Sequence, residues 1–478
     1  MKGIACFFFF SIICLTVPAQ TIEDSKKEKL ISDLLSFKSV LLSAHPNLYR
    51  FYSKTEFDSA FNEVESKIEG NTSDLDFFRY LSSIASMVGE AHTGLDISKD
   101  LANQIKENGK LLPFNIHFQN GKAYIKEELA DKNLHMRGKE IISINGKSIE
   151  QIVNQINTVS SIGTGFNLSR VYRMLSYSRN FSLSYYLYVD TSSSFLVEYQ
   201  DNGVEKTDVF EGIKPRFEVK TLLYPKESIP PFSFSIDRER DVAVLKITTF
   251  AHFIVDYSKK QYQRFFDSAF KQIEKEKISN LIIDVRNNRG GQELLGGYLL
   301  SYLNSEPFSI QKSIYAKEIN NTFNDSLKVI HHPFDTKHFI PGDTGYVLKK
   351  HMVLNPFQPK KRNAFKGKIY FIINGNCFSA CNIFAALADH YNLGIMVGEE
   401  TGGNYQDTDG YYGVSLELPY SKHILDFRKW HLKTNVTSPN HGRGVQPDVP
   451  FQPSVMDVIE GNDTAMKYAY RLIEESQE

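Results

Sequence analysis

The stretch from Ile369 to Asn404 reads IYFIINGNCFSACNIFAALADHYNLGIMVGEETGGN. It opens with an apolar run that predicts a buried strand, and an Asn-Gly-Asn sequence then breaks the strand. The apolar, Ala-rich segment after Ser379 predicts a helix, and Leu393–Val397 predicts another strand. A serine at such a strand-to-helix turn stands at the positive end of a helix, where an acyl-transfer enzyme holds its nucleophile. Serine is also a common helix cap, so this stretch alone leaves both roles of Ser379 open.

A second strand-to-helix turn lies earlier in the chain. Asn280–Val285 predicts a buried strand, the sequence RNNRGG follows it, and a helix is expected through Leu303. A Gly-Gly turn in this position exposes backbone N–H groups at the C-terminal edge of a sheet. Gly290 and Gly291 are therefore candidate oxyanion donors, although many turns of this kind use glycine for structural reasons alone.

A histidine lies in a glycine-bounded loop near the N-terminus. The helix expected over Leu75–Met87 is followed by GEAHTG, which places His92 outside any core stripe. Such a histidine is usually just solvated. Glu90 and Thr93 beside it can hydrogen-bond an imidazole, which favours a functional role.

Composition and the N-terminus limit the class of protein. The 478 residues are 41% hydrophobic and 23% charged with a net charge of −1 and no long basic run, so we expect no nucleic-acid partner. Lys2 and the apolar run Ile4–Leu15 predict a secretory signal peptide cleaved near Ala19 or Gln20. The run is shorter than a membrane span and no second one is long enough, so we expect a periplasmic or secreted protein with no transmembrane segment in the mature chain.

Two cysteines remain after signal cleavage, Cys377 and Cys381 on either side of Ser379. They could form a disulfide in an oxidising compartment or stay as free thiols. No metal-ligand spacing accompanies them, and no metal or cofactor is expected.

The rest of the chain divides by its periodicity. Residues 24–105 predict amphipathic helices, and short strands begin near residue 110. The order of Gly138, a strand and an Asn-Gly-Lys turn resembles the core of a PDZ domain, with an insertion over 160–188 before the closing strand 195–199. Residues 203–233 predict a connection, and 305–365 predict a polar insertion with few periodic signals.

Four motifs now stand in a familiar order: LIIDVRNNRGG, NGNCFSA, VGEETGGN and GRGVQPDV. This order resembles the C-terminal processing (tail-specific) serine protease family, in particular its tricorn-core-like branch. The resemblance implies an α/β fold, with a ClpP/crotonase-like catalytic core, an N-terminal helical domain and a PDZ-like domain. The corresponding boundaries are a signal peptide over 1–20, the helical domain over 21–106, the PDZ-like domain over 107–215 and the catalytic domain over 216–478.

The resemblance also implies catalytic roles. Ser379 corresponds to the nucleophile, but the lysine base of the bacterial tail-specific type is replaced here by Asn404. The tricorn-like arrangement takes its base from an N-terminal histidine, for which His92 in GEAHTG matches best. The glutamate expected before the Gly-Val-x-Pro-Asp segment to orient that histidine is missing, which leaves Glu90 and Glu400 as candidate orienting acids.

These residues predict a serine endopeptidase that acts on peptides or unfolded proteins through a Ser379 acyl-enzyme. The backbone N–H groups of Gly291, or Gly290, and of Ala380 are expected to stabilise the oxyanion. The alternative is a catalytically inactive member that binds peptides or apolar ligands. The sequence leaves cleavage specificity and oligomeric state open.

Overall fold

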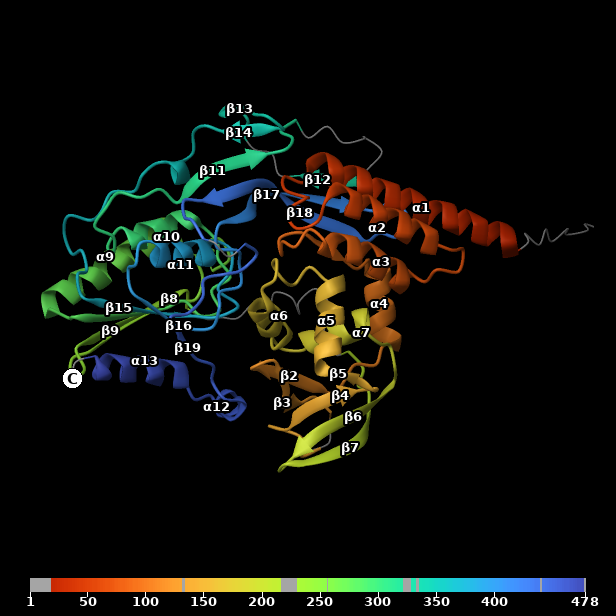
Figure 1. The fold of residues 1–478 in the computed structure, drawn as a ribbon, viewed down its shortest axis with the longest axis horizontal. Helices are drawn as coiled ribbons and strands as arrows, with labels where there is room; N and C mark the ends of the chain where they lie inside the picture. The colour runs from red at the N-terminus through yellow and green to blue at the C-terminus, as the bar shows by residue number, and fades with distance from the viewer. Residues whose placement is uncertain are drawn as a thin grey trace, which may run out of the picture.

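The computed structural model describes residues 19–130, 134–215, 230–255, 257–320, 328–331, 335–438 and 441–476. The predicted signal peptide lies outside these ranges except for its last two residues. No helix within them is long and apolar enough to cross a membrane. The described chain is a mixed α/β protein with three sheets (Figure 1).

The central sheet has the strand order β19-β16-β15-β10-β9-β8, and only β8 runs antiparallel to its neighbour. Its strands are β8 (Phe232–Asp237), β9 (Val242–Ile247), β10 (Asn280–Asp284), β15 (Lys368–Ile373), β16 (Ile395–Gly398) and β19 (Val449–Pro450). Parallel strands buried on both faces read as continuous apolar runs, which is why β10 and β15 are visible in the sequence.

Helices cover both faces of this sheet. One face packs against α9 (Lys259–Glu276), α10 (Glu293–Leu300) and α11 (Ala380–His390), and the other packs against α13 (Thr464–Glu475). The short helix α12 (Val455–Glu460) precedes α13. Successive β10 side chains divide between the two layers, since Leu281 and Ile283 join the first core and Ile282 joins the second. Because β10 and β15 are parallel neighbours, the turns that follow them open at the same edge of the sheet.

The second sheet corrects one expectation from the sequence. Residues 305–365 are not an irregular insertion, because the described part contains β11 (Gln311–Ala316), β12 (Lys328–His331), β13 (Phe339–Pro341), β14 (Tyr346–Leu348) and the short 3₁₀ helix Met352–Leu354. These strands join the long hairpin of β17 (Asp407–Glu417) and β18 (Ile424–Thr434) in the order β12-β17-β18-β11-β14-β13. The strand β1 (Gly94–Asp96) also pairs with β18, which brings the chain just after His92 onto this sheet.

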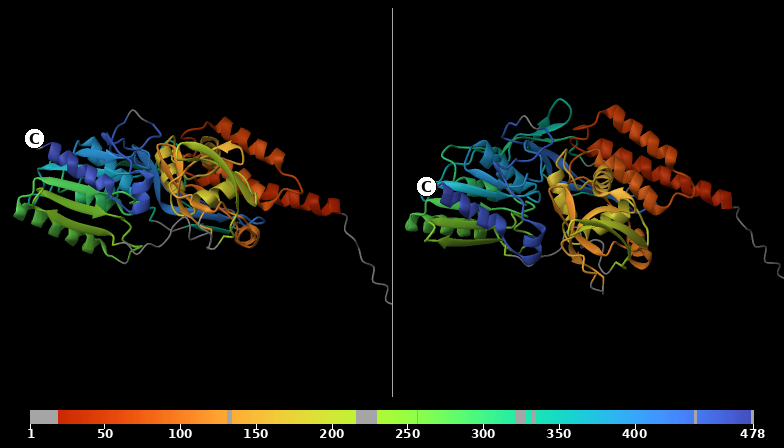
Figure 2. Two further views of the ribbon diagram at one scale, coloured as in Figure 1. Left: turned by 90° about the horizontal axis from the view of Figure 1, so that it is seen from below. Right: turned by 60° about the horizontal axis from the view of Figure 1, so that its bottom comes forward.

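The N-terminal helices pack on the half of the β17–β18 hairpin that lies nearest its turn. The helices α1 (Ala19–Ala44), α2 (Lys54–Lys67) and α3 (Asp74–Ser86) bury their apolar faces together with Val414, Leu416 and Phe427. In Figures 1 and 2 they project from the core on the side opposite to the C-terminus. The helix α4 (Lys99–Asn108) then leads to the third sheet.

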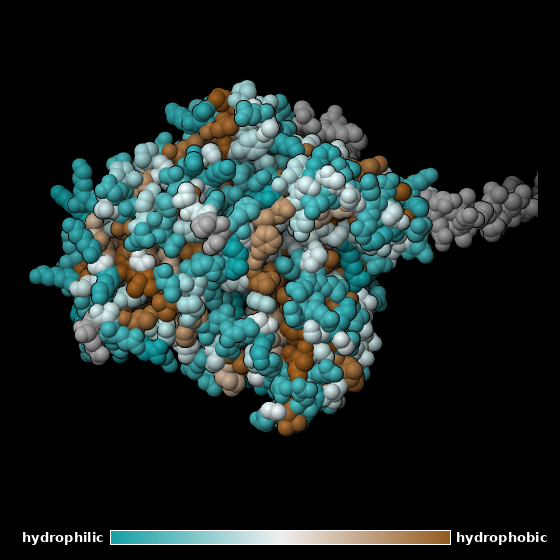
Figure 3. All heavy atoms as spheres, viewed as in Figure 1, coloured by the Kyte–Doolittle hydropathy of each residue, from teal (hydrophilic) through white to brown (hydrophobic). Residues whose placement is uncertain are grey.

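The third sheet has the order β2-β3-β4-β6-β7, with β5 paired to β4. Its strands are β2 (Phe114–Gln119), β3 (Lys122–Glu128), β4 (Glu140–Ile144), β5 (Lys147–Ser148), β6 (Ser194–Asp201) and β7 (Val204–Glu211), and its helices are α5 (Ile149–Val159), α6 (Leu168–Leu175) and α7 (Asn180–Tyr188). The expected connection over 203–233 is thus wrong at both ends, because it contains β7 and the start of β8. The face shown in Figure 3 is mostly hydrophilic, with apolar side chains gathered in small groups that include the junction between this domain and the core.

Candidate active site

Ser379 stands at the N-terminus of α11 in a backbone conformation that L-amino acids rarely adopt. Its φ is 54° and its ψ is −126°, and its side chain makes no capping hydrogen bond to the helix. Such strain costs about 1–3 kcal/mol and persists where the surrounding structure fixes it, often at functional sites. The structure therefore removes the helix-cap explanation and leaves a half-buried hydroxyl on a sharp strand-to-helix turn.

Hydrogen bonds hold the two strand-to-helix turns against each other. The N–H of Phe378 donates to the carbonyl of Asn288 at 3.1 Å. The N–H of Asn287 donates to Asn374 Oδ1 at 3.0 Å, and Asn374 Nδ2 donates back to Asn287 Oδ1 at 3.0 Å. The Gly-Gly turn after β10 is thereby fixed beside Ser379.

The three predicted oxyanion donors differ in availability. Gly290 donates its N–H to Asn288 Oδ1 at 2.9 Å, so this group is already paired. Gly291 is exposed, and within the described ranges its N–H has no acceptor. Ala380 begins α11, so its N–H has no intrahelical acceptor either. These two N–H groups are the ones that the geometry leaves for an oxyanion.

Gly290 instead serves close packing. A Cβ atom at this position would lie 2.7 Å from the Ala380 nitrogen and 2.8 Å from Ser379 Cβ, and the residue has a φ of 97°. Only glycine brings the two turns this close together.

The fold brings His92 to the serine turn although the two lie 287 positions apart (379 − 92). The His92 ring stacks on the ring of Phe378, the residue before Ser379, with centroids 4.6 Å apart. The guanidinium of Arg170 lies over the Phe378 ring at 3.6 Å. The loop histidine is thus part of this site.

Glu90 holds His92 through two contacts. Its Oε1 accepts from His92 Nδ1 at 2.9 Å and its Oε2 accepts from the His92 backbone N–H at 2.7 Å. Thr408 on β17 also donates its hydroxyl to Glu90 Oε1, at 3.1 Å. Burial by itself would raise the pKa of Glu90, but the charge and hydrogen bond of His92 hold it below its ordinary value. Because Nδ1 bonds this carboxylate, Nε2 is the ring nitrogen that Glu90 does not occupy.

The other candidate acid, Glu400, is committed elsewhere. Its Oε1 accepts from Arg443 Nε at 2.9 Å and from the Gly444 N–H at 2.8 Å. The structure therefore does not bring Glu400 to His92, and its ion pair instead holds the late Gly-Arg-Gly segment.

A buried polar cluster behind Glu90 was missed by the sequence reasoning. Asp409 on β17 bonds His431 Nδ1 at 2.9 Å and lies 3.3 Å from Arg50 Nη2. His45 donates through Nε2 to Thr93 Oγ1 at 2.9 Å, and its Nδ1 accepts from the Asn47 N–H at 3.2 Å. These residues come from segments hundreds of positions apart, and no local motif marks them.

The remaining predicted residues have structural contacts. Asn404, which replaces the expected lysine, is buried and donates to Asp407 Oδ1 at 2.6 Å. Cys377 and Cys381 are free, buried thiols with Sγ atoms 2.6 Å apart, and burial raises the pKa of Cys381. Across the described part of the chain, no three His, Cys, Asp or Glu side chains form a group that could hold a metal ion.

Residues 241–451, which include every strand of the central sheet except β8, both turns and Ser379, match the model of peptidase family S41. The chain carries a peptidase family S41 domain. By this domain it is a serine-type peptidase, as the motif order had suggested.

Solved structures share the fold of nearly the whole chain. Mature CPAF has a TM-score of 0.62 at 14% identity, with 94% of this chain and 97% of that chain covered. The complex of mature CPAF with lactacystin has a TM-score of 0.61 at 13% identity, with 95% and 98% covered. No curated protein sequence matches this one.

Proposed function

We propose that this protein is an exported serine endopeptidase that hydrolyses peptide bonds through a Ser379 acyl-enzyme. His92 is the general base and Glu90 orients it. The observation that carries the proposal is the hydrogen-bonded Glu90–His92 pair stacked on Phe378, beside a serine in a strained, uncapped turn.

The chemistry follows from these positions. Ser379 Oγ attacks the peptide carbonyl carbon and gives its proton to His92 Nε2. The N–H groups of Gly291 and Ala380 stabilise the oxyanion, and each such donor is typically worth roughly 10²–10³ in rate. The imidazolium then protonates the leaving amine, and water hydrolyses the acyl-enzyme with His92 again as base.

The domain arrangement inferred from the sequence fits this scheme. The central sheet with its strand-to-helix turns would be the ClpP/crotonase-like core, and residues 107–215 would be the PDZ-like domain. An N-terminal signal peptide would direct the protein to the periplasm or outside the cell, where peptides or unfolded proteins are the substrates. The reaction needs no metal or cofactor.

An inactive, ligand-binding protein on the same fold is the competing interpretation. It was favoured by the missing lysine and by the missing glutamate of the late motif. Glu90 supplies a carboxylate bonded to His92 Nδ1 from a different segment. The missing motif residue therefore no longer argues against catalysis.

A reactive-serine probe together with peptide hydrolysis tests the proposal. We expect a fluorophosphonate to label the wild-type protein at Ser379 and labelled casein to be degraded. The Ser379→Ala and His92→Ala variants should lose at least roughly 10⁴-fold in kcat. The exposed helix residue Ser66 provides the control, since Ser66→Ala should leave both readouts unchanged. Full hydrolysis by Ser379→Ala would rule out this mechanism, and an inert serine in a folded protein would favour the ligand-binding interpretation.

A further inference from the structure

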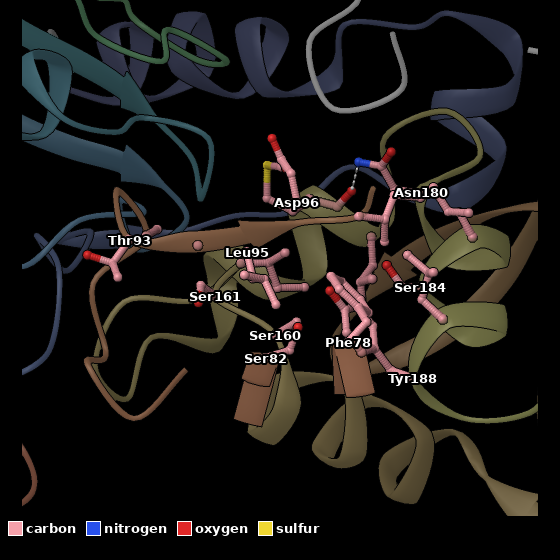
Figure 4. Close-up of a pocket in the computed structure, with 18 of the residues that line it drawn as sticks. Phe78, Ser82, Thr93, Leu95, Asp96, Ser160, Ser161, Asn180, Ser184 and Tyr188 are labelled. Carbon is pink, nitrogen blue, oxygen red and sulfur yellow. Dashed lines mark hydrogen bonds between the residues drawn. The ribbon is translucent and has the colours of Figure 1, made fainter. Parts of the chain in front are cut away.

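A pocket of about 190 Å³ lies directly beside the His92 loop. Its walls come from α3, the segment 91–97, the loop after α5, and helices α6 and α7 (Figure 4). Phe78 and Tyr188 stack at one end with ring centroids 5.9 Å apart, and Thr93 lies at the other end. The pocket thus forms where the N-terminal helices meet the helices of the third sheet.

The lining suits an apolar group. The large side chains are mainly apolar and come from several elements: Phe78, Leu95, Met174, Leu183, Leu187 and Tyr188. The polar lining consists largely of hydroxyl and amide groups, such as Ser184 and Asn180, and its charged members are Asp96 and Arg170. Asn180 Nδ2 donates to the Met174 carbonyl at 2.9 Å. A mostly apolar wall with a few polar groups is the usual character of a small-ligand site.

The pocket adjoins both halves of the proposed catalytic pair. Ala91 and Thr93, which flank His92 in the chain, line it. Arg170 also lines it, and the guanidinium of this residue lies over the ring of Phe378, next to Ser379. The pocket therefore adjoins the His92 loop and, through Arg170, the Phe378 ring beside Ser379.

The size limits the occupant to one side chain. A dry engineered cavity of about 150 Å³ accepts a benzene molecule, so about 190 Å³ holds one large aliphatic or aromatic group and no long lipid chain. We propose that this pocket binds a large apolar side chain, such as Leu, Met or Phe, close to the scissile bond of the peptide substrate. This inference rests on the proposed peptidase function, for which it names the substrate preference.

Direct binding can be measured without catalysis. The protein is full-length Ser379→Ala labelled with ¹³C-methyl methionine, and the measurement is an NMR titration. N-acetyl-phenylalanine amide should shift the methyl signal of Met174. The Met174→Leu variant assigns this signal, because the signal disappears from its spectrum. N-acetyl-serine amide should not shift this signal. Ser184→Phe, which fills the pocket, should abolish the response, and Ser66→Phe on exposed α2 should retain it. Ser161→Leu is a second filling variant if Ser184→Phe does not fold. An unmoved Met174 signal, or an unchanged response in a folded filling variant, would overturn the proposal.

Cleavage of a mixed peptide library gives the second readout, with products identified by mass spectrometry. We expect one position close to the scissile bond to favour large apolar residues over Gly and Ser by at least about 10-fold in kcat/KM. Ser184→Phe should remove the preference at that position alone, and Ser66→Phe should keep it. Cleavage without such a preference would overturn the pocket assignment while the peptidase proposal stands. Absence of any cleavage would overturn the peptidase proposal, and the methyl shift would still decide whether the pocket binds apolar side chains.

Discussion

At the scale of single residues, the proposed base and its proposed orienting acid come from one short loop. Glu90 precedes His92 by two residues, and its carboxylate bonds both the backbone and the ring of that histidine. The Thr93 N–H closes the loop on the Glu90 carbonyl at 2.9 Å. The orientation of the imidazole is therefore fixed locally, before the loop meets the serine.

Replacing Glu90 by Gln tests this role. The amide keeps the size and one acceptor oxygen but removes the negative charge that stabilises the imidazolium. We expect kcat to fall roughly 10²–10⁴-fold with little change in KM, as measured with a fluorogenic peptide. Glu400→Gln is the matched control and should change kcat much less, since Glu400 pairs with Arg443. Equal effects of the two substitutions would contradict the assignment of Glu90.

The candidate residues could be proposed from the sequence where short-range sequence patterns mark them. Ser379 and His92 stand in turns whose glycines and apolar flanks can be recognised without coordinates. The choice between Glu90 and Glu400 depends on which partner each side chain reaches, and both lie in glycine-bounded segments of similar appearance. The contact of Thr408 with Glu90 spans 318 positions and leaves no trace in either segment.

At the scale of elements, helices α6 and α7 cover the free edge of β2. The Phe118 N–H donates to Ser176 Oγ at 2.9 Å, and Arg173 donates to the Phe118 carbonyl. Ser182 Oγ donates to the Phe114 carbonyl at 2.8 Å. A peptide that adds a strand to a sheet needs these backbone groups unpaired. The third sheet therefore does not capture chain ends at β2 in the state described.

Peptide ends should accordingly matter little to the enzyme. We expect substrates with free and amidated C-termini to have kcat/KM values within about threefold of each other, measured with otherwise identical peptides. A strong loss on amidation would show that a carboxylate is bound and that α6 and α7 move away from β2. The control is a set of peptides of equal length in which the scissile bond lies at different distances from the C-terminus. This set separates recognition of the chain end from an effect of that distance.

The elements differ in how visible they are in the sequence, and the reason is burial. The strands β10 and β15 lie between two helical layers and read as continuous apolar runs. The strands β13 and β14 have only three residues each, two of them exposed in β13 and two half-buried in β14, and β7 is exposed at nearly every residue. Such strands have too few buried apolar positions for hydrophobic periodicity to reveal them.

At the scale of the whole molecule, the histidine loop is tied to the core through a shared buried interface. The helices α1–α3 and the hairpin β17–β18 form one hydrophobic core. Beside it, Arg50 from the N-terminal region lies between Asp407 and Asp409 at 3.3 Å from each. The N-terminal helices therefore hold the His92 loop in place, and weakening this interface should also weaken the proposed active site.

The stability of that interface should depend on pH through His45. Burial lowers the pKa of His45 to about 4, although the nearby Asp409 opposes the shift, while Arg50, Glu90 and His431 also face the ring with mixed effects. The unfolded chain binds this proton near pH 6.5, so stability is full above that pH and falls as pH drops toward 4. The loss amounts to at most about 3 kcal/mol. Burial by itself would raise the pKa of Asp409, but Arg50 and His431 hold this pKa at about 2. Protonation of Asp409 therefore lowers the stability of the fold only at a pH below the range of the His45 effect.

Substitution of His45 isolates this contribution. His45→Gln keeps a donor toward Thr93 but binds no proton in the unfolded state, so its free energy of unfolding should fall less steeply than wild type between neutral pH and about pH 4. Urea unfolding at a series of pH values measures the two slopes. Other buried histidines such as His117 contribute equally to both proteins. Identical slopes for wild type and His45→Gln would therefore show that His45 binds its proton at the same pH in the folded and unfolded states.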